Sequence, residues 1–191
     1  IKLHSATTAM ARAASVANNV IKDAKDSPQG DLVVTAPIAF GSTWLIERLH
    51  KFTELYPDIH LHLYLDDREY DLLKLEAECA IRLWAADKAD LIQRKLMSVK
   101  TSLYASPDYL EQFGTPERPE DLDNHRIIVY GEQISPMHVI NWAQRVGRDD
   151  RAPRDASLTV NNVVGMVRAA EAGLGVADLP DYMIPEQSKL K

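Results

Sequence analysis

The sequence predicts an α/β fold in which short buried strands alternate with amphipathic helices. Residues 32–36 read LVVTA, a continuous apolar and β-branched run of the kind that is buried on both faces of a parallel sheet. An amphipathic helical pattern follows this run and ends at Pro57. Near the end of the chain the same order returns, as a strand at 157–160, a capped helix and a strand at 176–179. This repetition is typical of α/β proteins, and 191 residues suffice for one large domain or two small ones.

The composition is that of an ordinary globular protein, with 46% apolar residues. The formal net charge of −6 argues against a nucleic-acid-binding surface on this segment. The single cysteine, Cys79, cannot form an internal disulfide and fits a reducing compartment. No apolar run approaches the roughly 18 residues of a membrane span, and no signal peptide is visible. We therefore expect a cytoplasmic protein that makes no contact with a membrane.

The first 26 residues are rich in alanine and contain neither glycine nor proline. Small and apolar residues recur there at spacings of three and four, which predicts an amphipathic helix with a narrow seam. Such a helix either packs on its own domain or serves as a linker or dimerisation helix, and we favour the second because it belongs to no α/β unit. Residues 27–30 (SPQG) then break the helix and begin the domain.

The turn after the first strand carries two small hydroxyl residues, Ser42 and Thr43. Either is a good candidate for the N-cap of the helix that runs to Pro57. A helix N-terminus presents unpaired N–H groups and a partial positive charge, so it is a natural seat for a small anion. Capping alone also explains these hydroxyls, and both interpretations stay open at this point.

Residues 59–65 (IHLHLYL) alternate strictly and predict a second strand. His60, His62 and Tyr64 share one face of it, and the aliphatic residues share the other. Two histidines at i and i+2 on a strand are able to chelate a metal, but we see no cysteine, aspartate or further histidine in a pattern that completes such a site. We therefore favour a face covered by a helix or by another subunit, and we predict no metal site and no cofactor.

A polar turn, 66–68 (DDR), follows that strand. The next expected elements are a short helix at 70–77 and a buried strand at 79–81. Ligands of open α/β sheets sit beyond the carboxyl ends of the strands, which places Asp66, Asp67 and Arg82 on the same rim as Ser42. Arg82 would there pair with a carboxylate ligand or form a structural ion pair, and the structural role is our default.

The second half of the chain carries the clearest helix start. Ser106 is an N-cap, Pro107 takes the first helical position and Gly114 ends the helix. The other elements expected here are strands at 91–97, 100–105, 126–130, 157–160 and 176–179, a short helix within 116–122, and a helix from a cap at Asn161 and Asn162 to residue 173. Residues 147–155 read as a charged surface loop or hairpin, and the residues from 186 on read as a polar tail with no closing element.

The sequence contains no glycine-rich phosphate loop, no paired cysteines, no HExxH and no GxSxG motif. We therefore expect a binding protein rather than an enzyme. Three turns carry hydroxyl or amide caps, at Ser42 and Thr43, at Ser106, and at Asn161 and Asn162. If these turns converge, they form a polar cleft lined by helix N-termini, which suits a small anionic ligand.

Six ordered segments resemble the effector-binding domain of the LysR-type transcriptional regulators. The most specific is LYASPDYLEQFGTPERPEDLDNH at 103–125, which is similar to the family pattern ASPAYLxxxGxPxxPxDLxxH. NNVVGMVRAAEAGLGVADLPDYM at 161–183 resembles the family segment N…RAAxAGLGIAxLPxxM. The other four are GDLVVTAPIAFG, LIERLHKFTELYPDIHLHLYLDD, AECAIRLW and DLIQRKL. Together the six segments span nearly the whole chain.

This resemblance implies a periplasmic-binding-protein type II fold, in which two Rossmann-like subdomains hold a ligand in the cleft between them. The subdomains would be residues 29–103 and 104–191, and residues 1–28 would be the end of a linker helix that comes from an N-terminal winged helix-turn-helix. The effector-binding residues implied are Ser42, Thr43, Asp67, Arg68, Ser106, Val160, Asn161 and Asn162. The resemblance also implies a homodimer or homotetramer, DNA binding only through the missing N-terminal domain, and a C-terminal strand and helix that this sequence does not include after Lys191.

We therefore expect a ligand-sensing regulatory domain that binds a small anionic effector. The alternative is a free periplasmic-type solute-binding protein of the same fold, which the alanine-rich first helix argues against. A small α/β enzyme is disfavoured by the absence of catalytic motifs from the sequence.

Overall fold

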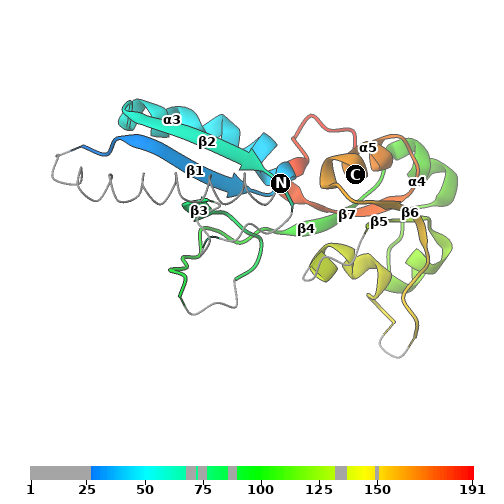
Figure 1. Cartoon of the computed structure of the whole chain (residues 1–191). Helices are drawn as coiled ribbons and strands as arrows, with labels where there is room; N and C mark the ends of the chain where they lie inside the picture. The colour runs from blue at the N-terminus through cyan, green and yellow to red at the C-terminus, as the bar shows by residue number, and fades with distance from the viewer. Residues whose placement is uncertain (1–26, 68–71, 73–76, 86–89, 132–136, 149–150) are drawn as a thin grey trace, which may run out of the picture. The chain divides into compact units, whose positions relative to one another are not determined.

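The computed structural model describes residues 27–67, 72, 77–85, 90–131, 137–148 and 151–191, and only the backbone of 137–140 (Figure 1). The chain folds as two compact units that divide between Ala85 and Ala86. The helix predicted at 1–26, Arg68 and most of the helix predicted at 70–77 lie outside the described residues. Within the described part, no helix combines the length and the apolar composition that crossing a membrane requires.

The first unit is built on a parallel sheet of three strands in the order β2-β1-β3. The strands are β1 (Gly30–Ala36), β2 (Ile59–Leu65) and β3 (Cys79–Ala80). Ala36 is level with Leu65, and Thr35 is level with Ala80. The three strands predicted for this part of the chain are confirmed, and their carboxyl ends meet at one edge of the sheet.

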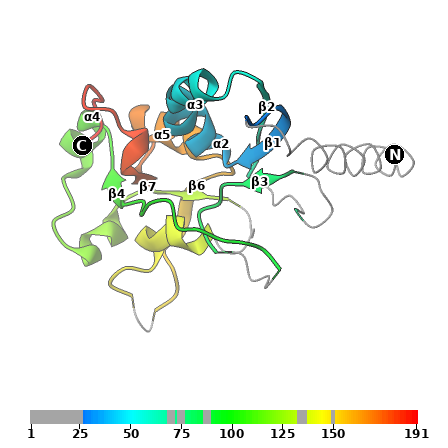
Figure 2. The same ribbon diagram turned by 90° about the vertical axis from the view of Figure 1, so that its left-hand side faces the viewer.

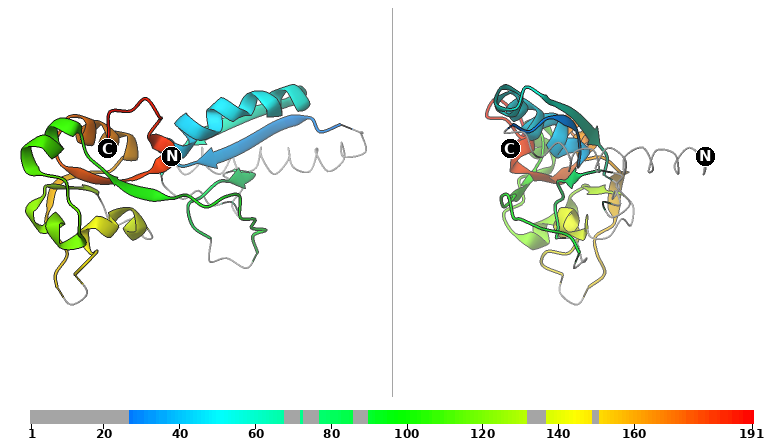
Figure 3. Two further views of the ribbon diagram at one scale, coloured as in Figure 1. Left: turned by 180° about the vertical axis from the view of Figure 1, so that it is seen from behind. Right: turned by 60° about the vertical axis from the view of Figure 1, so that its left-hand side comes forward.

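One helical segment connects β1 to β2 and runs along one face of the sheet (Figures 1 and 3). It consists of α2 (Ile38–Phe40), a π-helical turn η1 (Gly41–Leu45), a 3₁₀ turn η2 (Ile46–Arg48) and α3 (Leu49–Leu55). A Cβ at Gly41 would overlap the end of the Leu65 side chain, so this glycine lets the segment pass closely over the end of β2 without moving that leucine. The predicted helix is confirmed, but it begins directly after Pro37 and not at Ser42 or Thr43.

The second unit contains a sheet of four strands in the order β4-β7-β5-β6. The strands are β4 (Thr101–Tyr104), β5 (Ile127–Tyr130), β6 (Ala156–Val160) and β7 (Val176–Pro180). β5 is parallel to both β6 and β7, whereas β4 is antiparallel to β7. Helix α5 (Val163–Glu171) lies on one face of this sheet and the 3₁₀ segment η5 (Met137–Gln144) on the other (Figures 1 and 2).

The remaining helices close the core of the second unit. The helix predicted after Ser106 is α4 (Pro107–Phe113), and the short helix predicted within 116–122 is a 3₁₀ helix, η4 (Pro119–Asn124). A last 3₁₀ turn, η6 (Asp181–Met183), follows β7. Tyr109 and Leu122 from α4 and η4 pack against Ile127 and Val176, and all four side chains are at most 2% exposed. The core thus joins the predicted helices to the predicted strands.

Two expectations for connecting segments are wrong. Residues 91–97 form no strand, because no described strand pairs with them and apolar side chains there, including Ile92, lie in solvent. The described part of 147–155 is a loop as expected, but Arg154 within it is only 4% exposed. The tail does have a closing contact, because Leu190 is buried and Lys191 and Ala105 exchange two backbone hydrogen bonds of 2.9 and 3.0 Å.

Candidate functional site

The carboxyl edge of the first sheet gathers the polar turns that the sequence predicts. Because all three strands are parallel, the segments that begin at Pro37, Asp66 and Ile81 leave the sheet at the same edge. The Asp66 amide donates to the Ala36 carbonyl at 3.0 Å, and the Ile81 amide donates to the Thr35 carbonyl at 2.8 Å. This geometry confirms that residues 66 and 67, Arg82 and the start of the helical segment share one rim.

Asp67 holds the N-terminus of the helical segment. Its Oδ1 accepts a hydrogen bond of 3.0 Å from the Ile38 amide. A carboxylate at this position satisfies one of the unpaired N–H groups and complements the positive end of the helix dipole. The helix N-terminus at which we expected a small anion is therefore occupied by the Asp67 carboxylate.

Ser42 and Thr43 do not cap the helix, which corrects the expectation from the sequence. They lie inside its π-helical turn, where the Ser42 hydroxyl donates to the Ile38 carbonyl and the Thr43 hydroxyl donates to the Ala39 carbonyl, both at 2.7 Å. Serine and threonine commonly bond the preceding turn in this way when they lie within a helix. Ser42 is exposed and Thr43 half-buried. The exposed Ser42 oxygen has donated its only proton, so it can accept a hydrogen bond from a ligand.

Arg82 is held by hydrogen bonds within its own unit, and the structural ion pair expected from the sequence stays a prediction. Its guanidinium donates to the Ile81 carbonyl at 2.8 Å and to the Thr35 hydroxyl at 3.3 Å. Thr35 is fully buried, so the arginine ties the end of β3 to the interior of β1. These bonds fix the guanidinium within the rim.

In the second unit the predicted cap at Asn162 is confirmed. Its Oδ1 accepts from the Gly165 amide at 3.2 Å, with Asn162 at the N-cap of α5. Val160 ends β6, and its carbonyl accepts from the Gly131 amide at 2.8 Å. Asn161 is exposed between them. The turn therefore presents one free amide side chain, Asn161, beside the N-terminus of a nine-residue helix.

Ser106 also caps its helix as predicted, but it lies away from this turn. Its hydroxyl accepts from the Tyr109 amide at 3.3 Å, and the residue is 6% exposed. A Cβ on Gly173, just after the C-terminus of α5, would lie 3.3 Å from the Ser106 hydroxyl oxygen, whereas Asn162 caps the N-terminus of the same helix. A nine-residue helix is about 13 Å long. The expectation that all three capped turns converge is therefore wrong, because β4 runs antiparallel to its neighbour and delivers Ser106 to the opposite end of the sheet.

A surface cavity of about 410 Å³, which the sequence did not indicate, lies beside η4 in the second unit. Its polar lining includes Asp123, Arg148 and Arg154. Desolvation alone would raise the pKa of Asp123, but hydrogen bonds from Arg148 and Arg154 outweigh it and hold this pKa below its ordinary value. Arg154 also donates to three backbone carbonyls. The charged side chains that line the cavity therefore form hydrogen bonds with the protein itself and connect the surrounding loops.

Comparison with known proteins gives a consistent result. Residues 25–191 match the family described as the LysR substrate binding domain. An HTH-type transcriptional regulator of Haemophilus influenzae is 29% identical over 169 residues, which cover 88% of this chain and 58% of that protein. An HTH-type transcriptional regulator of Xanthomonas campestris is 31% identical over 179 residues, which cover 91% of this chain and 51% of that protein. The chain thus spans about half the length of the curated relatives it matches.

Solved structures show the same fold. The regulatory domain of CrgA, a LysR-type transcriptional regulator from Neisseria meningitidis, superposes with a TM-score of 0.73 at 25% identity, over 86% of this chain and 80% of that one. The structure of CrgA itself gives a TM-score of 0.73 at 22% identity, over 100% of this chain and 62% of that one. These similar proteins are transcriptional regulators and not enzymes.

Proposed function

Because the chain belongs to the LysR substrate-binding domain family and is the effector-binding regulatory domain of a LysR-type transcriptional regulator, we propose that it senses one small polar effector through the turns at the carboxyl ends of its strands. Ser42, Thr43, Asp67 and Arg68 supply the contacts of the first unit. Val160, Asn161 and Asn162 supply those of the second. Binding changes the arrangement of the domain, and the change passes to a DNA-binding domain.

The observation that carries this proposal is the repetition of one motif. In each unit a parallel strand ends where a helical segment begins, and this junction carries a hydrogen-bonding group that the cap of the helix does not use. In the first unit this group is the exposed hydroxyl of Ser42, which lies in η1, and in the second it is the amide of Asn161. Such carboxyl ends are where open α/β sheets bind ligands. Ser106 was also expected at the site. We do not include it in the proposal, because it caps α4 and lies near the C-terminal end of α5, away from Asn161.

The charges of the turns define the kind of effector. Asp67 already provides the negative charge at the helix of the first unit, so an anionic group is better received at the N-terminus of α5, beside Asn161. The Ser42 hydroxyl donates its proton to a backbone carbonyl, so its oxygen can accept a hydrogen bond from the effector. The effector is accordingly a small molecule that carries an anionic group and a hydrogen-bond donor.

The proposals on DNA binding, cellular location and oligomeric state rest on the family. The net charge of −6 is consistent with DNA contacts that are made by another domain. We propose that the regulator acts in the cytoplasm, where its DNA lies, as a homodimer or homotetramer. The curated relatives are HTH-type transcriptional regulators, which favours the sensor over the free solute-binding protein.

A thermal-shift screen of the chain against small metabolites tests the effector site. We expect acids that also carry a hydrogen-bond donor to raise Tm. Because a neutral hydrogen bond contributes about 0.5–1.5 kcal/mol, Thr43→Val and Asn161→Ala should each weaken the Kd by about three- to tenfold.

Matched controls separate loss of contact from loss of stability. Thr53→Val alters another helical threonine, whose hydroxyl donates to the His50 carbonyl at 3.0 Å, and Asn124→Ala removes another exposed amide. Both should leave the Kd unchanged. Stabilisation only by neutral or cationic metabolites contradicts the proposed chemistry, and equal weakening by site and control variants contradicts the proposed residues.

A further inference from the structure

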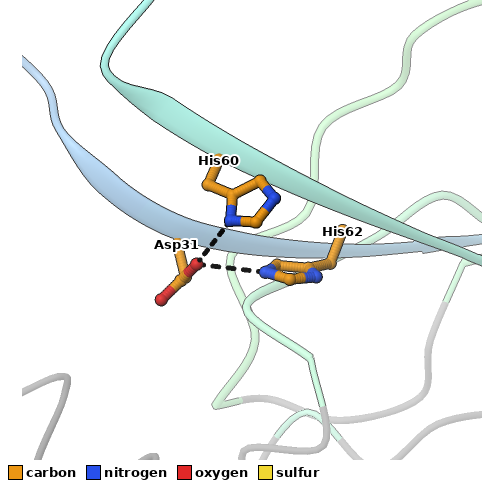
Figure 4. A group of neighbouring side chains, drawn as sticks. All are labelled: Asp31, His60 and His62. Carbon is orange, nitrogen blue, oxygen red and sulfur yellow. Dashed lines mark hydrogen bonds and ion pairs between the residues drawn. The ribbon is translucent and has the colours of Figure 1, made fainter.

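Three side chains that commonly bind metals meet at the amino end of β1, where Asp31 and His60 are exposed. Asp31 lies on β1, and His60 and His62 lie on β2. The parallel register pairs Asp31 with His60 and Val33 with His62, so all three side chains project from the same face. Figure 4 shows a nitrogen atom of each imidazole directed at the same oxygen of Asp31. The two histidines come from one strand, and the neighbouring strand supplies the aspartate, which is 31 residues from His62 in the sequence.

The distances in this cluster are those of a metal site. Asp31 Oδ1 lies 3.0 Å from His62 Nε2 and 3.3 Å from His60 Nδ1, and one ligand atom from each residue lies within 4.8 Å of the others. Ligands held at about 2.0–2.1 Å around a tetrahedral ion are separated by roughly 3.3 Å. Two of the three edges already have this length, and the third, between the two imidazole nitrogens, is no longer than 4.8 Å.

We propose that Asp31, His60 and His62 bind one divalent ion of the zinc, nickel and copper group. Imidazole nitrogen suits these ions, whereas magnesium and calcium prefer sites made of oxygen atoms. Three protein ligands leave at least one coordination position for water, as in open zinc sites.

This site is separate from the proposed effector site. Asp31 is at the amino end of β1, five residues before Ala36, where the strand reaches the rim, and such a stretch of strand spans about 17 Å. The side chains of Asp31 and His60 are 62% and 76% exposed, so an ion can reach them from solvent. An ion pair between such exposed groups contributes little to the stability of the fold.

The test is a calorimetric titration of the chain with Zn²⁺. It is carried out without a histidine tag and in a Cys79→Ser background, because Cys79 is an exposed thiol that also binds zinc. We expect one ion per chain. Asp31→Ala, His60→Gln and His62→Gln should each weaken the Kd by roughly tenfold or more, since each removes one of three ligands.

Two matched variants serve as controls. His50→Gln removes an exposed histidine on α3, and Asp58→Asn removes an exposed aspartate close to His60 in sequence. Both should retain the affinity of the parent. The absence of a one-to-one complex, or an equal loss in the cluster and control variants, overturns the proposal. Cobalt offers a second readout, because a tetrahedral Co²⁺ complex absorbs visible light strongly and should lose this band in His62→Gln.

Discussion

Replacing Arg154 by methionine is expected to lower the free energy of unfolding by about 2–3 kcal/mol, because it leaves backbone carbonyls that bond a buried guanidinium without their donor. The arginine side chain is only 3% exposed, and its Nε lies 2.7 Å from Asp123 Oδ1. Its other nitrogen atoms donate to the carbonyls of Ala143, Val146 and Pro119 at 2.6 to 2.8 Å. Methionine fills much of the same volume but leaves these acceptors without a donor.

Urea denaturation followed by tryptophan fluorescence measures this effect. Arg151→Met is the matched control, because Arg151 pairs with the same Asp123 at 3.3 Å but its side chain is 54% exposed. An exposed pair of this kind contributes about 1 kcal/mol or less. If Arg154→Met does not fold, Arg154→Lys keeps the charge without the planar fork and should show an intermediate loss. A loss below about 1 kcal/mol for both Arg154 variants would show that the cluster does not hold these loops together.

Replacing Asp178 by asparagine is expected to stabilise the protein at pH 8 and to remove a pH dependence. Asp178 lies in β7, is 1% exposed, and neither carboxyl oxygen accepts a hydrogen bond from another described residue. Burial raises the pKa of this carboxyl from 3.8 to about 7, and the nearby polar groups of Thr101 and Trp142 oppose the shift only in part. The native protein therefore holds a neutral Asp178 at a pH where the unfolded chain has released the proton.

The sign of the effect follows from proton linkage. Between about pH 4 and pH 7 the native state binds more protons at Asp178 than the unfolded state, so stability falls as the pH rises. The cost is fully present above pH 7 and amounts to about 2–4 kcal/mol. Asparagine cannot ionise, so the variant avoids this cost.

Thermal or urea unfolding from pH 5 to pH 8 checks this prediction. The measured quantity is the difference in stability between Asp178→Asn and the parent, which should grow with pH and level off above 7. Asp155→Asn removes one carboxylate from an exposed side chain and controls for the change in net charge. A difference that stays constant across this range would mean that Asp178 is ionised in the native state.

Features of the sequence that act locally were predicted well. Ser106 and Asn162 were identified as N-caps because a cap bonds an amide only three residues further along the chain. Ser42 and Thr43 looked equally suitable, yet the acceptor for the Ile38 amide is Asp67, 29 residues away. Pro37, directly before the first helical residue, is the local signal that could have placed the start correctly.

Features that depend on strand direction could not be predicted in this way. The strand at 101–104 was expected, but only its antiparallel pairing with β7 reveals that Ser106 lies away from Asn161 and Asn162. Arg154 looked like a surface charge because its carbonyl partners come from three other segments. The cluster of Asp31 with His60 and His62 likewise exists only because β1 and β2 are neighbours in register.

The most direct test of the sensing role uses the full-length regulator on operator DNA selected by genomic pull-down. The metabolite that stabilises the chain most in the thermal-shift screen is titrated into a DNase footprinting assay with the wild-type regulator and with Asn161→Ala. The wild-type footprint should change its extent or affinity as the metabolite saturates, and the variant should need roughly tenfold more metabolite for the same change. A footprint that stays the same at a saturating concentration, although the metabolite binds the chain, would contradict the sensing role.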